Sequence, residues 1–364
     1  MKRYLFLIFF ISLNSYYLAF SDTNKEKAQE LGEQAMQHFQ KGEFDRAILL
    51  LNDAITLDSF SLVYKYEKAL AFYQKKEFEK ALVILNELLE HPEVSDQVYQ
   101  LIGNCYGMLE RYDDAISAYN EGLQKFPNSG RLYMELGLTM LTKTTLKNVI
   151  GYWEKGVEVD PNFQYNYYHL ADYYSSIARR VWGLIYAEIF LNYELTPLKS
   201  RNICRLFKEV YSAGFYNFND STLNVNFTSL RIFSDSTIKK SASNFELAYQ
   251  EIMKEIAQKY LSPKLKRLDA FEIATVRRVF IEKWFQKKYN ELYPNILFTR
   301  HKQMLDEGIF DIYNLWLLRE CNKDEFENFA KQNIDIYKKF EYWLNHNYLI
   351  FDAKNYMYRY MYDK

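Results

Sequence analysis

The sequence predicts an all-α protein, with a solenoid of paired helices in its first half and a helical bundle in its second. Three observations predict this fold class. Small residues recur every 34 residues through the first half, apolar residues follow the helical period in the second, and the 364 residues include only 12 glycines and 6 prolines. β-Sandwiches and barrels need many tight turns and therefore more of both residues. At about 100 to 200 residues per domain, the length predicts two or three folding units.

Residues 1–21 have the pattern of a secretory signal peptide. Lys2 and Arg3 precede an apolar run over residues 4–13, and the tripeptide Ala19-Phe20-Ser21 places small residues where signal peptidase reads them. This run is shorter than the ~20 residues that span a bilayer. An uncleaved anchor is the alternative interpretation. We expect cleavage after Ser21 and a soluble, exported chain, periplasmic or secreted, with no remaining membrane span.

Two series of small residues, each with a period of 34, organise the region that follows. The first series is Ala35, Ala69, Gly103, Gly137 and Ala171, and the second is Ala47, Ala81, Ala115, Val149 and Gly183. Bulky residues flank each member at helical spacing, as Tyr99, Ile102 and Tyr106 flank Gly103. Two antiparallel helices with one apolar seam do not bury that seam alone, so such units stack.

This pattern resembles the tetratricopeptide repeat (TPR), a helix–turn–helix unit of 34 residues. The five units are 28–61, 62–95, 96–129, 130–163 and 164–197. The fourth unit departs from the pattern at Thr144-Thr145-Leu146, where the usual turn is missing, and the fifth has Arg180 at an aromatic position. A stripe of bulky residues over 200–214, ending at Gly214, predicts a helix that caps the last unit. The resemblance thus implies a TPR solenoid over residues 22–215.

The second half has no 34-residue phase. Residues 216–244 are rich in Ser, Asn and Thr, and the alternation over 223–227 is typical of a short strand, with a loose linker as the alternative. Helical stripes return over 245–260, 273–292, 297–307, 310–319 and about 324–345. The end of the chain is too aromatic for an ordinary disordered tail. We expect a helical C-terminal domain over 245–364.

No motif for catalysis, phosphate binding or metal binding is present, so we predict no catalytic, cofactor or metal residues. His169 precedes Asp172 by one helical turn, but a packed or solvated pair is expected there rather than a metal site. The three cysteines do not make a disulfide framework, and we expect core thiols, with one disulfide as the alternative. Balanced charge, 46 basic against 47 acidic residues, gives no reason to expect a nucleic-acid partner.

The sequence therefore favours a non-enzymatic scaffold that binds a protein or peptide segment. In TPR families, positions 2, 5, 9 and 12 of each unit line the concave groove. The candidate groove residues are Phe39, Tyr66, Tyr73, Asn104, Arg131, Leu138, Tyr165, Tyr168 and Asp172. No unit has the Lys and Asn pair that grips a C-terminal carboxylate, so a neutral or apolar segment is expected. Three alternatives stay open: a groove filled by the C-terminal half, a small-ligand or glycan binder, and an enzyme housed in the C-terminal domain.

Overall fold

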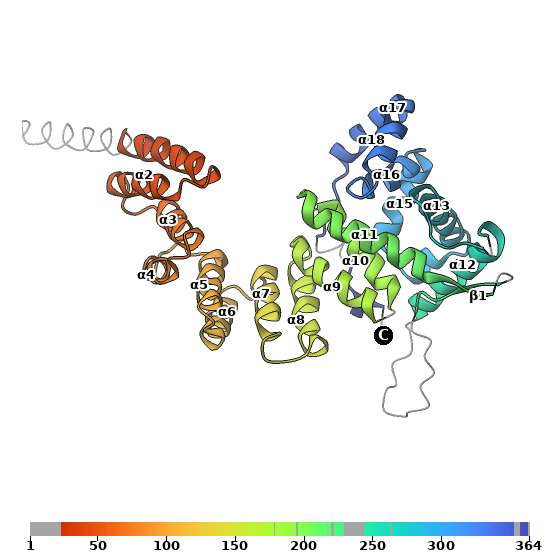
Figure 1. The fold of residues 1–364 in the computed structure, drawn as a ribbon, viewed down its shortest axis with the longest axis horizontal. Helices are drawn as coiled ribbons and strands as arrows, with labels where there is room; N and C mark the ends of the chain where they lie inside the picture. Colours follow the sequence, from red (N-terminus) through yellow and green to blue (C-terminus); the bar gives the residue numbers. More distant parts are fainter. Residues whose placement is uncertain are drawn as a thin grey trace, which may run out of the picture. The chain divides into compact units, whose positions relative to one another are not determined.

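The structure is a computed structural model of the chain that describes residues 23–177, 179–193, 196–219, 222–228, 244–262, 264–352 and 357–362. It divides into two compact units, unit 1 up to Lys143 and unit 2 from Thr144 (Figure 1). The expected signal peptide and its cleavage site lie outside the described residues. Among the helices that are described, none is long and apolar enough to cross a membrane.

Unit 1 is a series of antiparallel helix pairs. It contains a first helix over residues 23–40, then α2 (Phe44–Leu57), α3 (Leu62–Gln74), α4 (Phe78–Leu88), α5 (Asp96–Met108), α6 (Tyr112–Lys125) and α7 (Gly130–Met140). Unit 2 begins with the same kind of element: α8 (Leu146–Val159), α9 (Gln164–Ser176), α10 (Arg180–Tyr193) and α11 (Pro197–Gly214). The all-α prediction is confirmed.

The helices keep the 34-residue period of the sequence. The second helix of each pair begins at Phe44, Phe78, Tyr112, Leu146 and Arg180, so each start follows the previous one by 34 residues. The two small-residue series lie on the buried side of these helices, and Ala35, Ala47, Ala69 and Ala81 have no exposed surface. The series therefore marks the seams of the pairs, as predicted.

The turn inside the first three pairs uses one backbone conformation. Gly42, Lys76 and Glu110 stand at the same repeat position, and their φ angles are +77°, +62° and +60°. Left-handed backbone is unfavourable for residues with a Cβ atom, so this turn requires it at that position. In the fourth pair α7 ends at Met140, and α8 begins only after Thr145. The predicted departure at residues 144–146 coincides with the division between the two units.

A two-stranded hairpin follows α11. Strands β1 (Phe215–Asn219) and β2 (Thr222–Val225) pair antiparallel, with Phe215 opposite Val225. The strand expected from residue 223 onward is therefore present, although it ends at Val225 rather than at 227. The remainder of the Ser/Asn/Thr-rich segment, residues 229–243, lies outside the described residues. The expected boundaries of the C-terminal domain stay a prediction.

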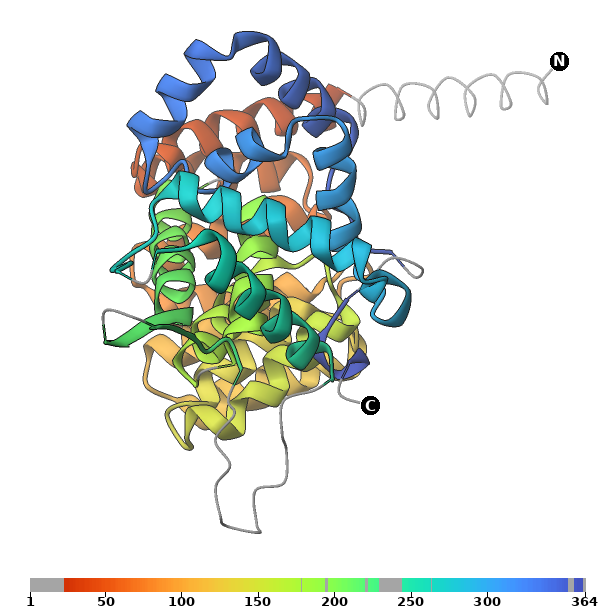
Figure 2. The same cartoon turned by 90° about the vertical axis from the view of Figure 1, so that its right-hand side faces the viewer.

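The rest of unit 2 is a helical bundle. It contains α12 (Asn244–Tyr260), α13 (Ala270–Gln286), α14 (Tyr289–Leu292), α15 (Ile296–Asp306), α16 (Phe310–Leu317), α17 (Lys323–Gln332), α18 (Ile334–His346) and the 3₁₀ turn η1 (Arg359–Met361). Helices α12 and α13 lie side by side (Figures 1 and 2). Two stripes that were expected to be single helices are each interrupted. Lys288, with φ of +59°, separates α13 from α14, and Asn333 separates α17 from α18.

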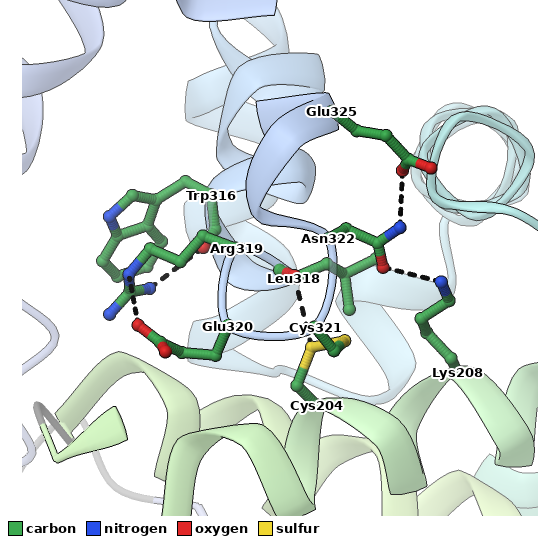
Figure 3. Close-up of a disulfide and its surroundings, with 9 residues drawn as sticks. All are labelled: Cys204, Lys208, Trp316, Leu318, Arg319, Glu320, Cys321, Asn322 and Glu325. Carbon is green, nitrogen blue, oxygen red and sulfur yellow. Dashed lines mark hydrogen bonds and ion pairs between the residues drawn. A yellow bond between two sulfur atoms is a disulfide. The ribbon is translucent and has the colours of Figure 1, made fainter. Parts of the chain in front are cut away.

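A disulfide joins Cys204 on α11 to Cys321, which follows α16 (Figure 3). Only Cys105 is a free buried thiol within the described residues. The expectation of three core thiols was therefore wrong, and the disulfide alternative holds. The two half-cystines are 117 residues apart in sequence, and the bond joins α11 to the turn that follows α16. Nearby, Lys208 donates a 2.6 Å hydrogen bond to the side chain of Asn322 across the same contact (Figure 3).

Candidate functional site

The first helices of repeats three and four, α5 and α7, are connected by a chain of polar side chains. Arg131 donates to Oε1 of Gln100 at 3.0 Å and lies 3.9 Å from a carboxylate oxygen of Asp96. Gln100 in turn donates to Glu135 at 2.6 Å. These polar side chains lie on the expected groove face, because Gln100 stands at position 5 of its unit and Arg131 at position 2 of the next. They are partly exposed. The row contains both hydrogen-bond donors and acceptors that a peptide segment lying across α5 and α7 could use.

Tyr66 on α3 belongs to the same face. Burial raises the pKa of its hydroxyl, while Arg131 opposes and Asp96 reinforces that shift, so the three groups lie within electrostatic range. The ring packs against the core of repeats two and three and is only partly exposed. Tyr66 therefore presents a partly buried phenol group beside the row of polar side chains formed by Gln100, Arg131 and Glu135.

Other predicted groove residues are used within their own repeats. Phe39 packs edge-to-face on Phe44 with ring centroids 5.2 Å apart, and Tyr73 packs on Phe78 in the same way at 5.4 Å. Both pairs join repeat position 12 to the first residue of the second helix. Asn104 accepts a 2.6 Å hydrogen bond from the hydroxyl of Tyr119, which is buried. These side chains contribute to repeat packing as well as to the face.

Leu138 is partly exposed on α7, whereas the last three predicted groove residues lie in unit 2. The amine of Lys199 lies 3.8 Å from the centre of the Tyr165 ring, and the Tyr168 ring packs edge-to-face on Phe190. Asp172 is exposed. The nine predicted residues are thus divided between the two units.

An open cleft of about 580 Å³ lies between the first helix and α3. Its lining residues are Gln29, Gly32, Glu33, Met36, Gln37, Gln40, Ser61, Val63, Tyr64 and Glu67. They include two glutamates and no lysine or arginine, and burial raises the pKa of Glu67. The cleft combines apolar side chains with two glutamates and no basic residue, so it suits a neutral or basic segment.

Unit 2 contains a buried cluster with the residue types of an acid–base site. Glu188 accepts hydrogen bonds from Arg277, from the hydroxyl of Tyr313 at 2.7 Å and from His301 at 2.7 Å. Burial alone raises the pKa of Glu188, but Arg277 and His301 outweigh it, so that pKa lies well below its usual value. Burial lowers the pKa of His301, although Glu188 opposes the shift.

This cluster has no room for a substrate. The cavity beside Glu188 and His301 measures about 20 Å³, which is near the space of one water molecule. All four side chains are almost fully buried. The arrangement satisfies a buried carboxylate, because an unpaired charge at this depth is costly.

No protein family matches the sequence, and no curated protein matches it. The fold is similar to solved helical-repeat structures. Pseudomonas aeruginosa PilF is 18% identical, with a TM-score of 0.42 over 52% of this chain and 90% of that one. The Thermus thermophilus TPR protein TTC0263 is 15% identical, with a TM-score of 0.41 over 50% and 98%. The TPR protein YrrB is 17% identical, with a TM-score of 0.32 over 48% and 89%.

The helix pairs, their 34-residue starts and the buried small-residue seams decide the repeat type. They are TPR units. In these units, residues about 31 to 35 apart meet between neighbouring first helices, as Gln100 meets Arg131 and Glu135.

Asp96 and Glu135 also belong to the groove face, but they were not predicted from the sequence. The spacing of about one repeat could have revealed both. Both are acidic residues one repeat length from a polar partner. The cleft at the N-terminal end is lined by four residues at expected groove positions, Gln29, Gly32, Met36 and Val63, but its size depends on how closely the first helix approaches α3. Gly32 permits that approach, since a Cβ atom there would lie 2.7 Å from the ring of Tyr64.

Metal binding finds no support in the part of the chain that is described, where no group of three or more His, Cys, Asp or Glu side chains is placed to hold an ion. His169 stacks on Trp153 with ring centroids 4.7 Å apart. Burial, reinforced by Lys199, lowers its pKa to about 4. The packed interpretation of His169 agrees with this contact.

Proposed function

We propose that the protein is a non-enzymatic interaction scaffold of the cell envelope or exterior, and that it binds a partner segment along the first-helix face of unit 1. The observation that carries this proposal is the row formed by Tyr66, Gln100, Arg131 and Glu135 across α3, α5 and α7. Side-chain amides and a guanidinium bind the backbone of an extended segment, and half-buried aromatic rings supply apolar area.

The charges of this face define the class of partner. Arg131 is already paired with Gln100 and Asp96, so it does not act as a dedicated carboxylate clamp. The adjoining cleft carries Glu33 and Glu67 and no lysine or arginine. We infer a segment that is neutral or apolar along the row and neutral or basic where it enters the cleft.

Two observations support export. The basic and apolar pattern of residues 2–13 is typical of a signal peptide, and disulfides such as Cys204–Cys321 persist mainly in oxidising compartments. N-terminal sequencing of the native protein tests this proposal. We expect a first residue of Asp22, and an intact Met1 in a cytoplasmic fraction would contradict it.

The non-enzymatic part of the proposal is supported by the cluster around Glu188. A catalytic carboxylate and histidine need access to a substrate. Here both are buried beside a cavity of about 20 Å³ and are engaged by Arg277 and Tyr313. The cluster therefore pairs a buried carboxylate within the bundle and offers no access to a substrate.

Site-specific photo-crosslinking in the native envelope tests the binding face. Val63, on α3 in the cleft, and Val83, on the second helix α4, are 54% and 63% exposed. A benzophenone side chain introduced at either position therefore reaches solvent equally well. We expect a discrete adduct from position 63 and none from the control position 83. Adducts of equal yield at both positions, or only at 83, would place binding elsewhere.

A further inference from the structure

The C-terminal segment of the chain is bound by repeats four and five through side chains. Within residues 347–352 and 357–362, the one regular element is the 3₁₀ turn η1. Arg359 is 6% exposed, and its Nε atom lies 3.0 Å from Oε1 of Glu154 and 2.7 Å from the hydroxyl of Tyr174. Its backbone N–H donates to the hydroxyl of Tyr186 at 3.1 Å. The pocket combines α8, α9 and α10.

The contacts of Arg359 suit a guanidinium better than an ammonium. Glu154 is 1% exposed, so it needs a buried cationic partner. The guanidinium also stacks over Tyr360 at 4.0 Å and lies 5.6 Å from the ring of Tyr174. A lysine ammonium lacks the planar group that makes these contacts at once.

A second anchor binds the backbone of the C-terminal segment rather than a side chain. The amide of Asn162 donates to the carbonyl oxygen of Phe351 at 2.8 Å and accepts from its N–H at 3.0 Å. The Phe351 ring stacks on those of Tyr167 and Tyr193, with centroids 6.2 and 6.3 Å away. Exchange of two hydrogen bonds with one residue is how a side-chain amide holds an extended peptide.

A third anchor is Tyr362, whose ring packs on Trp182 and Phe245 at 5.5 and 4.6 Å. Its hydroxyl donates to the carbonyl oxygen of Pro294 at 2.5 Å. The three anchors are side chains or single backbone groups, so their release unwinds no long helix.

We propose that α8, α9 and α10 form a peptide-binding site for an arginine flanked by aromatic residues, and that the C-terminal segment occupies it as an exchangeable internal ligand. The site is independent of the face on unit 1. It uses Tyr167, Tyr174 and Tyr186, at repeat positions 4, 11 and 23, rather than the groove positions 2, 5, 9 and 12. An internal ligand has a high effective concentration, so an external peptide binds only when the internal one is weakened.

A fluorescent peptide with the sequence of residues 348–362 tests the proposal by anisotropy on the full chain. We expect it to bind Arg359→Ala at least ten-fold more tightly than the wild-type chain. The control Arg319→Ala removes an arginine that stacks on Trp316 elsewhere in unit 2, and it should behave as wild type. Adding Glu154→Gln to Arg359→Ala should reverse the gain, as should a peptide with alanine at the arginine position.

Three results would overturn the proposal. One is a folded Arg359→Ala chain that does not bind the peptide, and another is equal binding to wild type and variant. The third comes from hydrogen exchange on the wild-type chain. We expect the amide of Arg359 to exchange at least ten-fold faster than amides in the middle of α10. If it exchanges as slowly as they do, the segment is a fixed part of the core, and the same conclusion follows if Arg359→Ala no longer melts cooperatively.

Discussion

Gly103 and Gly107 lie one turn apart on α5 and offer a matched test of the repeat seam. A Cβ atom built on Gly103 would lie 2.2 Å from Cε1 and 2.4 Å from Cζ of Tyr119, whereas one on Gly107 meets nothing within 4 Å. Carbon atoms pack at about 3.5 to 4.0 Å, so the Tyr119 ring must move by more than about 1 Å to admit the methyl group. That ring is 1% exposed, and its hydroxyl is bound by Asn104.

The expected change in the free energy of unfolding follows from two opposing effects. Replacing a helical glycine by alanine stabilises a helix by about 0.5 to 1 kcal/mol, and overpacking a core costs about 1 to 3 kcal/mol. Gly107→Ala has only the first effect, so its free energy of unfolding should rise by up to about 1 kcal/mol. Gly103→Ala has both effects, so its free energy of unfolding should fall by up to about 2.5 kcal/mol relative to wild type.

Urea unfolding followed by two probes measures this difference. Far-UV circular dichroism reports helices of both units, whereas all 5 tryptophans follow residue 143 and therefore report unit 2. We expect Gly103→Ala to lower the midpoint of the circular dichroism transition and to leave that of tryptophan fluorescence almost unchanged. If Gly103→Ala and Gly107→Ala are equally stable, Tyr119 does not occupy the seam and the assigned register of α5 and α6 is wrong.

Three further predictions concern unit 2. Because the folded pKa of His169 is about 4, below the unfolded value near 6.5, its contribution to stability is present at neutral pH and is lost, by up to about 3 kcal/mol, as the pH falls from 6.5 towards 4. Thermal melts of wild type and His169→Phe at pH 7 and 4.5 check this, and an equal loss in both chains would contradict it. Cys204→Ser with Cys321→Ser should lower the free energy of unfolding by about 2 to 5 kcal/mol, because the bridge closes a long loop. Reduced wild type should match this variant in tryptophan-detected urea unfolding, and an unchanged midpoint would show that the bridge does not stabilise unit 2. Gly156→Ala places a Cβ atom 2.4 Å from the buried Asn166 amide and should lower the melting temperature, whereas the control Gly151→Ala, with nothing within 4 Å, should not.

The repeat region was predictable because its contacts are local and periodic. Ala69 and Ala81 stand twelve residues apart in one pair, and the next pair repeats them as Gly103 and Ala115. One pattern therefore specifies each seam and each helix start. The polar row was predictable in part, since Gln100 and Arg131 occupy expected positions, although the acidic partners Asp96 and Glu135 were not expected.

Unit 2 could not be predicted to the same depth because its decisive contacts have no period. Glu188 meets Arg277 and His301 across separations of 89 and 113 residues. Cys204 meets Cys321 across a separation of 117 residues. Helical stripes locate such helices in the chain, but nothing in their spacing says which faces meet. The breaks at Lys288 and Asn333 were missed because ordinary polar residues, not Gly or Pro, occupy them.

The sequence separation of the contacts in each unit affects how that unit folds during synthesis. Hydrogen bonds between neighbouring repeats of unit 1 join residues only 30 to 36 apart, so each repeat can dock as soon as the next has emerged. Unit 2 instead closes through Asn162 with Phe351 and Glu154 with Arg359, across 189 and 205 residues. Long-range closure is slow, and it exposes apolar surface until it is complete. Residues 357–362 thus supply contacts that the repeats of unit 2 lack until synthesis is nearly finished, and a nascent chain that stops before residue 357 leaves the carboxylate of Glu154 without its arginine.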